Sequence, residues 1–246
     1  MMAQPARTPH RLADSEPGAH SATAPKPSVV ASAPAQGAKA SRPDGRRPPS
    51  EGKVKMRIIA GRHRGRVLRA PEGAATRPTA DRVRQALFDM LWHASWGGRT
   101  MVQNQLVLDA FAGTGALGLE ALSRGADHAT FLERDRAALA VLRANIAACK
   151  EEPRTAVLAI DATKPPRARV PCGLVFLDPP YGKELVPQAV SALGAAGWIR
   201  PGALVVAEMG EGEALNLPGF EVLAQRSHGA ATLHMLRAPG AVAEGQ

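Results

Sequence analysis

Four consecutive residues, Asp178, Pro179, Pro180 and Tyr181, bring hydrogen-bond acceptors and an aromatic ring to one point of the chain. They follow a short apolar run, 174–177, whose length and sharp ending predict a buried strand. Two prolines in a row fix φ and remove two backbone donors, so the Asp178 side chain and the adjoining carbonyl oxygens are acceptors without a local donor. Because ligands bind at the carboxyl ends of strands in open α/β sheets, we expect a ligand here.

The ring of Tyr181 stands beside these acceptors with a face available for stacking. A planar base with an exocyclic amino group would satisfy both features, because its hydrogens need acceptors and its ring needs a stacking partner. Asp-Pro-Pro is also ordinary loop chemistry, so a strand that simply ends in a turn is the alternative interpretation. Asp-Pro-Pro-Tyr resembles the motif of methyltransferases that modify exocyclic amines of nucleobases, and such enzymes also need a nucleotide-type cofactor site.

A glycine-rich loop upstream predicts that cofactor site. An apolar strand at 106–109 leads into residues 113–118, Gly-Thr-Gly-Ala-Leu-Gly, which match G-x-G-x-x-G and open a helix that ends near Gly125. A second strand at 128–132 follows, with Glu133 at its end, 20 positions after the first glycine. This βαβ arrangement is typical of a nucleotide site.

The residues around the loop leave two cofactor classes open. Taken literally, G-x-G-x-x-G followed by an acidic residue predicts NAD. Asp109 argues against NAD, because a carboxylate four residues before the first glycine would repel a pyrophosphate, whereas a cationic sulfonium would tolerate it. Asp109-x-Phe111-x-Gly113-x-Gly115 resembles the first motif of S-adenosylmethionine-dependent methyltransferases, and Glu133 resembles their second.

This resemblance implies S-adenosyl-L-methionine as the cofactor. In those enzymes the glycines make room for the methionine and the ribose, and the acid after the second strand accepts from both ribose hydroxyls. Asp161 and Ala162 follow the next predicted strand, where the third motif places a side chain near the adenine amine. The candidate cofactor-binding residues are therefore Asp109, Phe111, Gly113, Gly115, Glu133, Asp161 and Ala162.

The elements that must position these residues alternate between strand and helix. Beyond the first two strands, the pattern predicts helices at 136–148 and 184–195, strands at 156–160, 174–177 and 203–207, and a hairpin formed by 220–226 and 231–237. Strands that alternate with helices and close with a hairpin indicate an α/β fold. We expect a doubly wound Rossmann-like sheet of the class I methyltransferase type with a closing antiparallel hairpin.

Positive charge is concentrated in one short segment before this sheet. The formal net charge is +9, and residues 53–84 hold ten Lys or Arg against two Asp or Glu. Two short apolar runs flank a basic turn at 62–64, which predicts a small basic β-hairpin. A helix is predicted to follow, with Thr79 as its N-cap and Asp81 in its first turn.

Clustered positive charge of this kind is typical of a module that binds nucleic acid. For any single residue, a solvated charged turn is the alternative interpretation. The candidate RNA contacts are Arg57, Arg62, Arg64, Arg66, Arg77, Arg82 and Arg84.

The chain divides into four predicted parts. Residues 1–52 are rich in Ala, Pro, Ser and Gly and cannot bury enough apolar surface to offset their ordering entropy, so we predict a disordered tail. The basic hairpin occupies 53–78, the catalytic domain 79–238 and a flexible C-terminus 239–246. The tail has two other interpretations: a transit peptide, which its acidic residues and prolines disfavour, or translation that begins at Met56.

Composition argues against several other classes of protein. No apolar run approaches the ~18 residues that a membrane span requires. Cys149 and Cys172 have no metal-ligand spacing, and the seven histidines are scattered, so we expect neither a metal nor a disulfide framework. We therefore expect a cytoplasmic protein, and a monomer.

The residues before the catalytic domain carry a more specific resemblance. They are similar to the opening signature of the bacterial 16S ribosomal RNA guanine-N2 methyltransferases, at Arg57-Ile58-Ile59-Ala60-Gly61, Arg64-Gly65, Arg77-Pro78-Thr79, Asp81-Arg82-Val83-Arg84 and Leu87-Phe88. The resemblance extends from Met56 to about Arg237. The sequence departs from the signature at Gln85, where an acidic residue is expected, and in its long N-terminal extension.

That family resemblance implies methyl transfer from S-adenosylmethionine to N2 of one guanine in 16S rRNA. Because a basic module reads phosphates and shape more than sequence, we expect that guanine to be presented by a small-subunit ribosomal particle. Acceptors at Asp178 and the Pro179 carbonyl would bind the hydrogens of the amine, and Tyr181 would stack on the extruded base. The implied catalytic residues are Asp178, Pro179, Pro180 and Tyr181.

Three alternatives remain open at this stage. A methyltransferase for DNA adenine N6, or for another nucleobase amine, shares every motif except the basic opening. An NAD-binding oxidoreductase fits the glycine fingerprint. A catalytically inactive RNA-binding assembly factor would keep the same fold.

Overall fold

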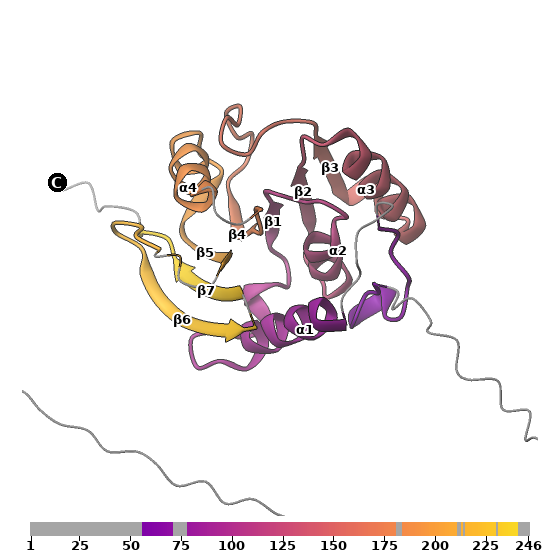
Figure 1. The fold of residues 1–246 in the computed structure, drawn as a ribbon, viewed down its shortest axis with the longest axis horizontal. Helices are drawn as coiled ribbons and strands as arrows, with labels where there is room; N and C mark the ends of the chain where they lie inside the picture. Colours follow the sequence, from indigo (N-terminus) through magenta and orange to yellow (C-terminus); the bar gives the residue numbers. More distant parts are fainter. Residues whose placement is uncertain are drawn as a thin grey trace, which may run out of the picture. The chain divides into compact units, whose positions relative to one another are not determined.

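A seven-stranded sheet carries the candidate site, with its strands in the order β3-β2-β1-β4-β5-β7-β6 (Figure 1). The strands are β1 (Leu106–Asp109), β2 (His128–Leu132), β3 (Thr155–Leu158), β4 (Cys172–Leu177), β5 (Ile199–Gly210), β6 (Glu221–His228) and β7 (Ala231–Arg237). Neighbours are parallel, except that β7 is antiparallel to both β5 and β6. The predicted doubly wound sheet with a closing hairpin is confirmed.

The structure, a computed structural model, describes residues 56–70, 78–180, 184–210, 213, 215–229 and 231–240, all within the unit Pro49–Gln246. The predicted tail at 1–52 lies outside these residues, as do Arg77 and Tyr181.

Helices cover both faces of the sheet (Figure 1). They are α1 (Pro78–His93), α2 (Ala116–Ser123), α3 (Arg136–Cys149) and α4 (Leu185–Ala195). Side chains of α1, α2 and α3 share one hydrophobic core with Phe176 of the sheet, and α4 packs into a second core with Val175. Phe176 and Val175 are consecutive in β4, and their side chains point to opposite faces of the sheet because side chains alternate along a strand. None of the helices in the described part of the chain is long and apolar enough to cross a membrane.

Several predicted boundaries differ from the structure, most of them by one or two residues, and two of the differences are informative. Helix α1 begins at Pro78, so Thr79 lies within the helix and the prediction that it is the N-cap is wrong. Proline suits the first helical position, since its fixed φ is helical and its missing N–H has no partner there anyway. Strand β5 extends from Ile199 to Gly210, beyond both ends of the predicted strand at 203–207, and it continues through the Pro-Gly pair at 201–202.

Residues 56–70 form the predicted basic hairpin in a reduced form. Arg57 and Val67 make an isolated antiparallel bridge. The tip is a turn of 3-10 helix, Gly61–His63, rather than a tight two-residue turn.

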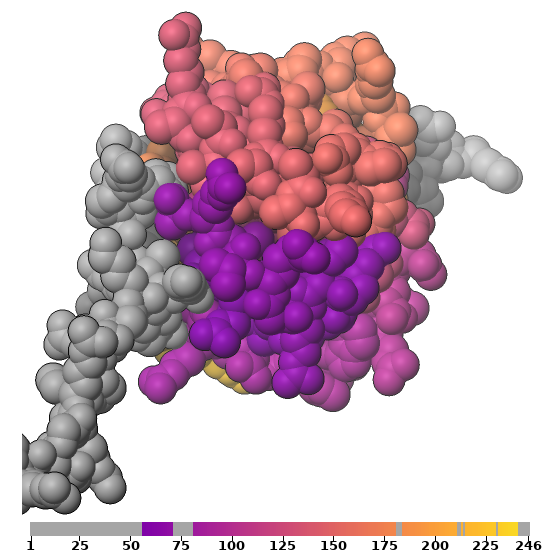
Figure 2. Space-filling model, turned by 90° about the vertical axis from the view of Figure 1, so that its right-hand side faces the viewer, coloured from indigo at the N-terminus to yellow at the C-terminus, as the bar shows by residue number. Residues whose placement is uncertain are grey.

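This hairpin packs as part of the catalytic domain. Ile58 is completely buried and Leu68 is 3% exposed, and both belong to the core that contains α1, α2 and α3. Figure 2 shows the outer surface of the segment, in indigo, continuous with its neighbours. The predicted boundary between 53–78 and 79–238 therefore crosses a shared hydrophobic core.

Candidate active site at the carboxyl ends of the parallel strands

A cavity of about 630 Å³ lies at the carboxyl ends of β1, β4 and β5. Its wall includes Asp109 and Phe111 from the β1 end, Asp178 from the β4 end and Glu208 near the end of β5. The glycine-rich loop contributes Gly113 to the same wall. A cavity of this size falls in the range of ordinary ligand sites, and its position is the one that open α/β sheets favour. The structure thus brings the predicted catalytic carboxylate and part of the predicted cofactor loop together.

The three glycines of the fingerprint have different structural roles. A Cβ at Gly113, where φ is +52°, would meet nothing within 4 Å, so the loop leaves open space there. A Cβ at Gly115 would collide with the Leu142 side chain, and one at Gly118 would collide with the ring of Phe131. Gly113 remains a candidate cofactor contact. Gly115, predicted as another, lies outside the cavity wall and is required for the left-handed turn before α2 and for packing.

Asp109 is almost fully buried, with 1% of its surface exposed. Its carboxylate accepts a hydrogen bond of 3.0 Å from the amide of Gly118. Burial raises the pKa of Asp109 to about 7, the hydrogen bond from Gly118 opposes the rise, and the charge of Glu133 adds to it. A positively charged ligand in the cavity would offset this cost and favour the ionised carboxylate.

Glu133 is not part of the cavity wall, and its carboxylate holds the backbone of the glycine loop. Its carboxylate accepts a hydrogen bond of 2.8 Å from the amide of Gly113 and one of 2.7 Å from the amide of Asp135. Its predicted contact with ribose hydroxyls would therefore compete with, or add to, contacts that already hold the loop.

The third predicted motif also lies outside the cavity wall. Hydrogen bonds from the amide and the hydroxyl of Thr163 lower the pKa of Asp161, and Arg134, 2.8 Å away, lowers it further. The side chain of Ala162 is buried in the core on the α4 face. A cofactor could therefore reach Ala162 only through its backbone.

Asp178 follows β4 directly and lines the cavity. Burial of its carboxyl group raises the pKa of Asp178 above the usual range, and the charges of Glu208 and Asp109 raise it further. Much of the residue is exposed, which limits the rise because water stabilises the charged form. Pro179 is buried and Pro180 is exposed, while Tyr181 lies outside the described residues.

Two ionisable residues of the cavity wall were missed in the sequence. Glu208 lies near the end of β5, and a signal for it existed, since a carboxylate directly follows the predicted strand at 203–207 just as Asp178 follows its own. His228, at the end of β6, also lines the cavity, and its Nε2 atom is buried without a hydrogen-bond partner among the described residues. No local pattern distinguishes this histidine from the others.

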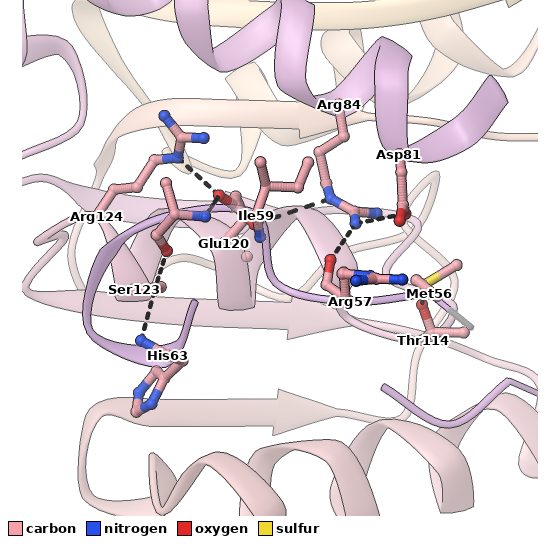
Figure 3. Close-up of polar contacts among 12 residues, drawn as sticks. Met56, Arg57, Ile59, His63, Asp81, Arg84, Thr114, Glu120, Ser123 and Arg124 are labelled. Atoms are coloured by element: carbon pink, nitrogen blue, oxygen red, sulfur yellow. Dashed lines mark hydrogen bonds and ion pairs between the residues drawn. The ribbon is translucent and has the colours of Figure 1, made fainter. Parts of the chain in front are cut away.

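A buried carboxylate fastens the basic hairpin to α2 (Figure 3). Glu120 is completely buried and accepts hydrogen bonds from the amides of Ile59, at 2.7 Å, and Ala60, at 3.0 Å. Arg124 lies 2.7 Å from the same carboxylate, and Arg84 lies 3.9 Å from it. The hairpin backbone is thus held by a charge that arginines neutralise.

A second buried carboxylate holds the hairpin tip. Glu151 is 3% exposed and lies at the end of α3. Its carboxylate is 2.5 Å from His63, 3.3 Å from Arg62 and 2.5 Å from Arg154. The tip residues predicted to face RNA therefore also make contacts within the protein.

The glycine loop is tied to both ends of the hairpin through Thr114. The Thr114 hydroxyl lies 3.5 Å from the sulfur of Met56 (Figure 3). The Asn145 amide nitrogen donates to the carbonyl oxygens of Thr114, at 2.9 Å, and Arg69, at 3.1 Å. The Asn145 carbonyl oxygen accepts from the amide of Arg69 at 2.8 Å. One buried side chain therefore joins the exit of the hairpin to the cofactor loop.

The predicted RNA contacts divide by exposure. Arg84 is only 5% exposed, and it donates to the carbonyl of Arg57 at 2.6 Å and to Asp81 at 2.9 Å. It orders the start of α1 against the hairpin and also lines the cavity, so its contact with RNA stays a prediction. Exposed arginine side chains from the predicted set are Arg57, Arg62, Arg64, Arg66 and Arg82.

Two of these exposed arginines also bind the protein. Arg62 donates to the carbonyl of Leu122 at 3.1 Å, and Arg66 donates to that of Ala148 at 2.5 Å. In the part of the chain that the structure describes, no group of three His, Cys, Asp or Glu side chains could hold a metal ion.

Comparison with known proteins assigns the chain to a family. Residues 56–237 match the family model described as Conserved hypothetical protein 95. The ribosomal RNA small subunit methyltransferase D of Escherichia coli is 39% identical over 163 residues, 66% of this chain and 79% of the relative. The protein of the same name from Haemophilus influenzae is 37% identical over 170 residues, 68% and 84% of the two chains.

Solved structures agree with that assignment. A candidate methyltransferase from Escherichia coli, yhhF, has a TM-score of 0.65 and 33% identity, over 76% of this chain and 99% of that one. A hypothetical protein from Thermus thermophilus has a TM-score of 0.57 and 30% identity, over 73% and 98%. The match to the family model and the shared fold show that this chain belongs to the family described as Conserved hypothetical protein 95 and is a methyltransferase.

Proposed function

We propose that this protein transfers a methyl group from S-adenosylmethionine to the exocyclic N2 amine of one guanine in 16S rRNA, presented by a small-subunit ribosomal particle. The observation that carries the proposal is the meeting of Asp178, Asp109 and Gly113 in one cavity. Curated relatives at 37–39% identity are named as small-subunit ribosomal RNA methyltransferases, which supports the choice of substrate class. A ribosomal substrate would place the activity in the cytoplasm.

The residues present fit this cofactor. Open space in front of Gly113 leaves room for a bulky ligand, and Asp109 supplies a buried carboxylate that a cation would stabilise. S-adenosylmethionine supplies an electrophilic methyl group on a positively charged sulfur. Asp109 and the loop backbone at Gly113 would hold it, and Phe111 would shield it from water. Glu133 would act mainly by fixing the loop.

Asp178 and the Pro179 carbonyl would act on the base. The lone pair of a guanine N2 is delocalised into the ring, so the nitrogen is a weak nucleophile. Acceptors that bind its hydrogens favour the tetrahedral nitrogen of the transition state. The nitrogen must also lose a proton as the new bond forms. Asp178 can take that proton because its raised pKa brings it closer to the working pH of a general base.

The exposed arginines of the hairpin and of α1 would bind the RNA backbone. Arg57, Arg64 and Arg82 are exposed. Contacts of this type fix position without reading sequence. Selection of a single guanine would then come from the folded surface of the particle together with contacts to the flipped base.

Methyl transfer to matched substrates tests the proposal. Small-subunit particles from cells that lack the enzyme, naked 16S rRNA and duplex DNA would each be incubated with the protein and labelled S-adenosylmethionine. We expect labelling of the particles at one guanine N2, located by mass mapping, and little labelling of DNA. Methylation of DNA adenine at a rate equal to that of the particles would replace this proposal with the DNA-modifying alternative.

A further inference from the structure

A second carboxylate, Glu208, lines the same cavity as Asp178. Leu177, the last residue of β4, pairs with Ala207 of β5, so Asp178 directly after β4 and Glu208 within β5 follow a paired position of the two parallel strands. Adjacent strands lie about 4.8 Å apart. Asp178 and Glu208 both line the cavity.

The two carboxylates face the same side of the sheet. Leu177 and Ala207 point into the core on the α4 face. Because side chains alternate along a strand, Glu208 points to the other face, where α1 and the glycine loop lie, and Asp178 lines the same cavity there. The two carboxylates also interact electrostatically, since the negative charge of Glu208 raises the pKa of Asp178. A ligand with two adjacent hydrogen-bond donors would relieve the repulsion between them.

Guanine is a base that offers such a pair of donors. Its ring N1–H and its N2 amino group lie side by side on the Watson–Crick edge, which enzymes read when they flip a base. Adenine and cytosine carry a ring acceptor beside their amino group. A carboxylate placed opposite that acceptor would leave two acceptors facing each other, which disfavours the wrong base.

We propose that Glu208 accepts a hydrogen bond from N1–H of the target guanine while Asp178 holds the N2 amine, and that Glu208 thereby selects guanine against bases with a ring acceptor beside their amine. The inference rests on the proposed function and adds the residue that reads the base. In this arrangement Glu208 contacts the base and does not contact the transferred methyl group. A substitution of Glu208 should therefore change which base is methylated as well as how fast it is methylated.

An analogue that changes only the ring edge tests this role. Particles would be assembled with 16S rRNA that carries either guanine or 2-aminopurine at the modified position. The analogue keeps the N2 amine but has an unprotonated N1 and lacks the O6 atom. Wild-type protein should prefer guanine by roughly 100-fold, because a site built around a hydrogen bond strongly rejects a substrate that cannot make it.

Variants at Glu208 should change the preference itself. Glu208→Gln should lower the rate on guanine by roughly 100-fold and remove or reverse the preference, because its amide can donate to the unprotonated N1. Glu208→Asp keeps the charge and should retain the preference at a lower rate. Glu221→Gln, an exposed glutamate on β6, is the matched control and should behave as wild type.

The outcomes separate this inference from the proposed function. A Glu208→Gln protein with the wild-type preference for guanine, or one that loses both substrates equally, would overturn the role of Glu208. If wild-type protein transfers no methyl group to guanine N2 in any particle, the proposed function fails and this inference fails with it. Binding of S-adenosylhomocysteine, measured by calorimetry, should be unchanged in every variant.

Discussion

Two groups of carboxylates in this protein differ in the charge of the side chains that surround them. Glu120 and Glu151, which hold the hairpin, are surrounded by arginines, a histidine and backbone amides. Asp109, Asp178 and Glu208, which line the cavity, are gathered with one another, and like charges raise the pKa of Asp178. Both groups are acidic, but arginines lie beside the carboxylates of the first group, whereas in the second group the charges of Glu208 and Asp109 raise the pKa of Asp178.

The difference assigns a role to each group. A buried carboxylate paired with arginines has low free energy in the folded protein, and removing one partner leaves an uncompensated charge. A carboxylate such as Asp178, whose pKa is raised by burial and by neighbouring carboxylates, is costly to the fold unless a ligand supplies positive charge or hydrogen-bond donors. The first group therefore maintains the structure, and the second is poised for a ligand.

The largest expected effect is the loss of activity when a carboxylate of the cavity is removed. Asp178→Ala should lower kcat by roughly 10³-fold or more, because it removes both an acceptor for the amine and the proposed base. Titration calorimetry with S-adenosylhomocysteine should give unchanged affinity, and thermal unfolding should show no loss of stability. A folded Asp178→Ala protein with normal turnover would show that the catalytic centre lies elsewhere.

Breaking the paired group should affect stability instead. Glu120→Gln leaves Arg124 without its countercharge in the interior, while Arg84 keeps Asp81, and we expect a loss of about 3–5 kcal/mol in the free energy of unfolding. Urea denaturation would measure it. The exposed, weakly paired Glu221→Gln should change stability by less than about 0.5 kcal/mol. Equal effects of the two substitutions would contradict the structural role of Glu120.

Substitution of Asp109 should raise the stability of the protein, whereas substitution of Glu120 should lower it. Because its pKa is about 7 in the folded protein and about 4 in the unfolded chain, its contribution to stability is greatest at low pH and falls as the pH rises from 4 to 7. Asp109→Asn removes this fall, so it should stabilise the protein by up to about 4 kcal/mol at pH 8 and by little at pH 4. It should also weaken binding of S-adenosylmethionine. Denaturation curves at both pH values provide the test.

The smallest expected effect concerns exposed charge. Replacing Arg57, Arg64 and Arg82 by Gln together should weaken RNA binding and reduce the slope of its salt dependence by roughly one unit for each lost phosphate contact. Stability and cofactor affinity should not change, because these side chains are exposed. Arg169→Gln, in the segment that packs on the α4 face, is the control. Unaltered RNA binding by the triple variant would remove the hairpin from the RNA interface.

Local patterns predicted the sheet because each strand depends on its own apolar run. The positions of Asp109 and Asp178 at strand ends followed from those runs, and the cavity confirms that they come together. Glu208 could have been found by the same reasoning. The pattern of the glycine loop was also correct as a motif, but it could not separate Gly113, which faces open space, from Gly115, whose Cβ position is filled by Leu142.

Long-range charge pairing could not be predicted in this way. Glu120 binds the amide of Ile59, which lies 61 residues earlier, and Glu151 binds His63, which lies 88 residues earlier. Neither partner is visible from neighbouring residues. Arg84 was predicted to be an RNA contact because the segment around it is basic, yet the fold turns it inward toward Asp81 and Glu120.

The side chain of Asn145 couples the motions of two segments that lie far apart in the sequence. Since the same amide group binds residue 69 in two hydrogen bonds and residue 114 in one, neither segment can move alone without breaking a hydrogen bond in the interior. Amide hydrogens in the two segments should therefore exchange with solvent through a common opening event. Linkage is reciprocal, so a ligand that slows exchange in the loop slows it at the end of the hairpin by the same free energy.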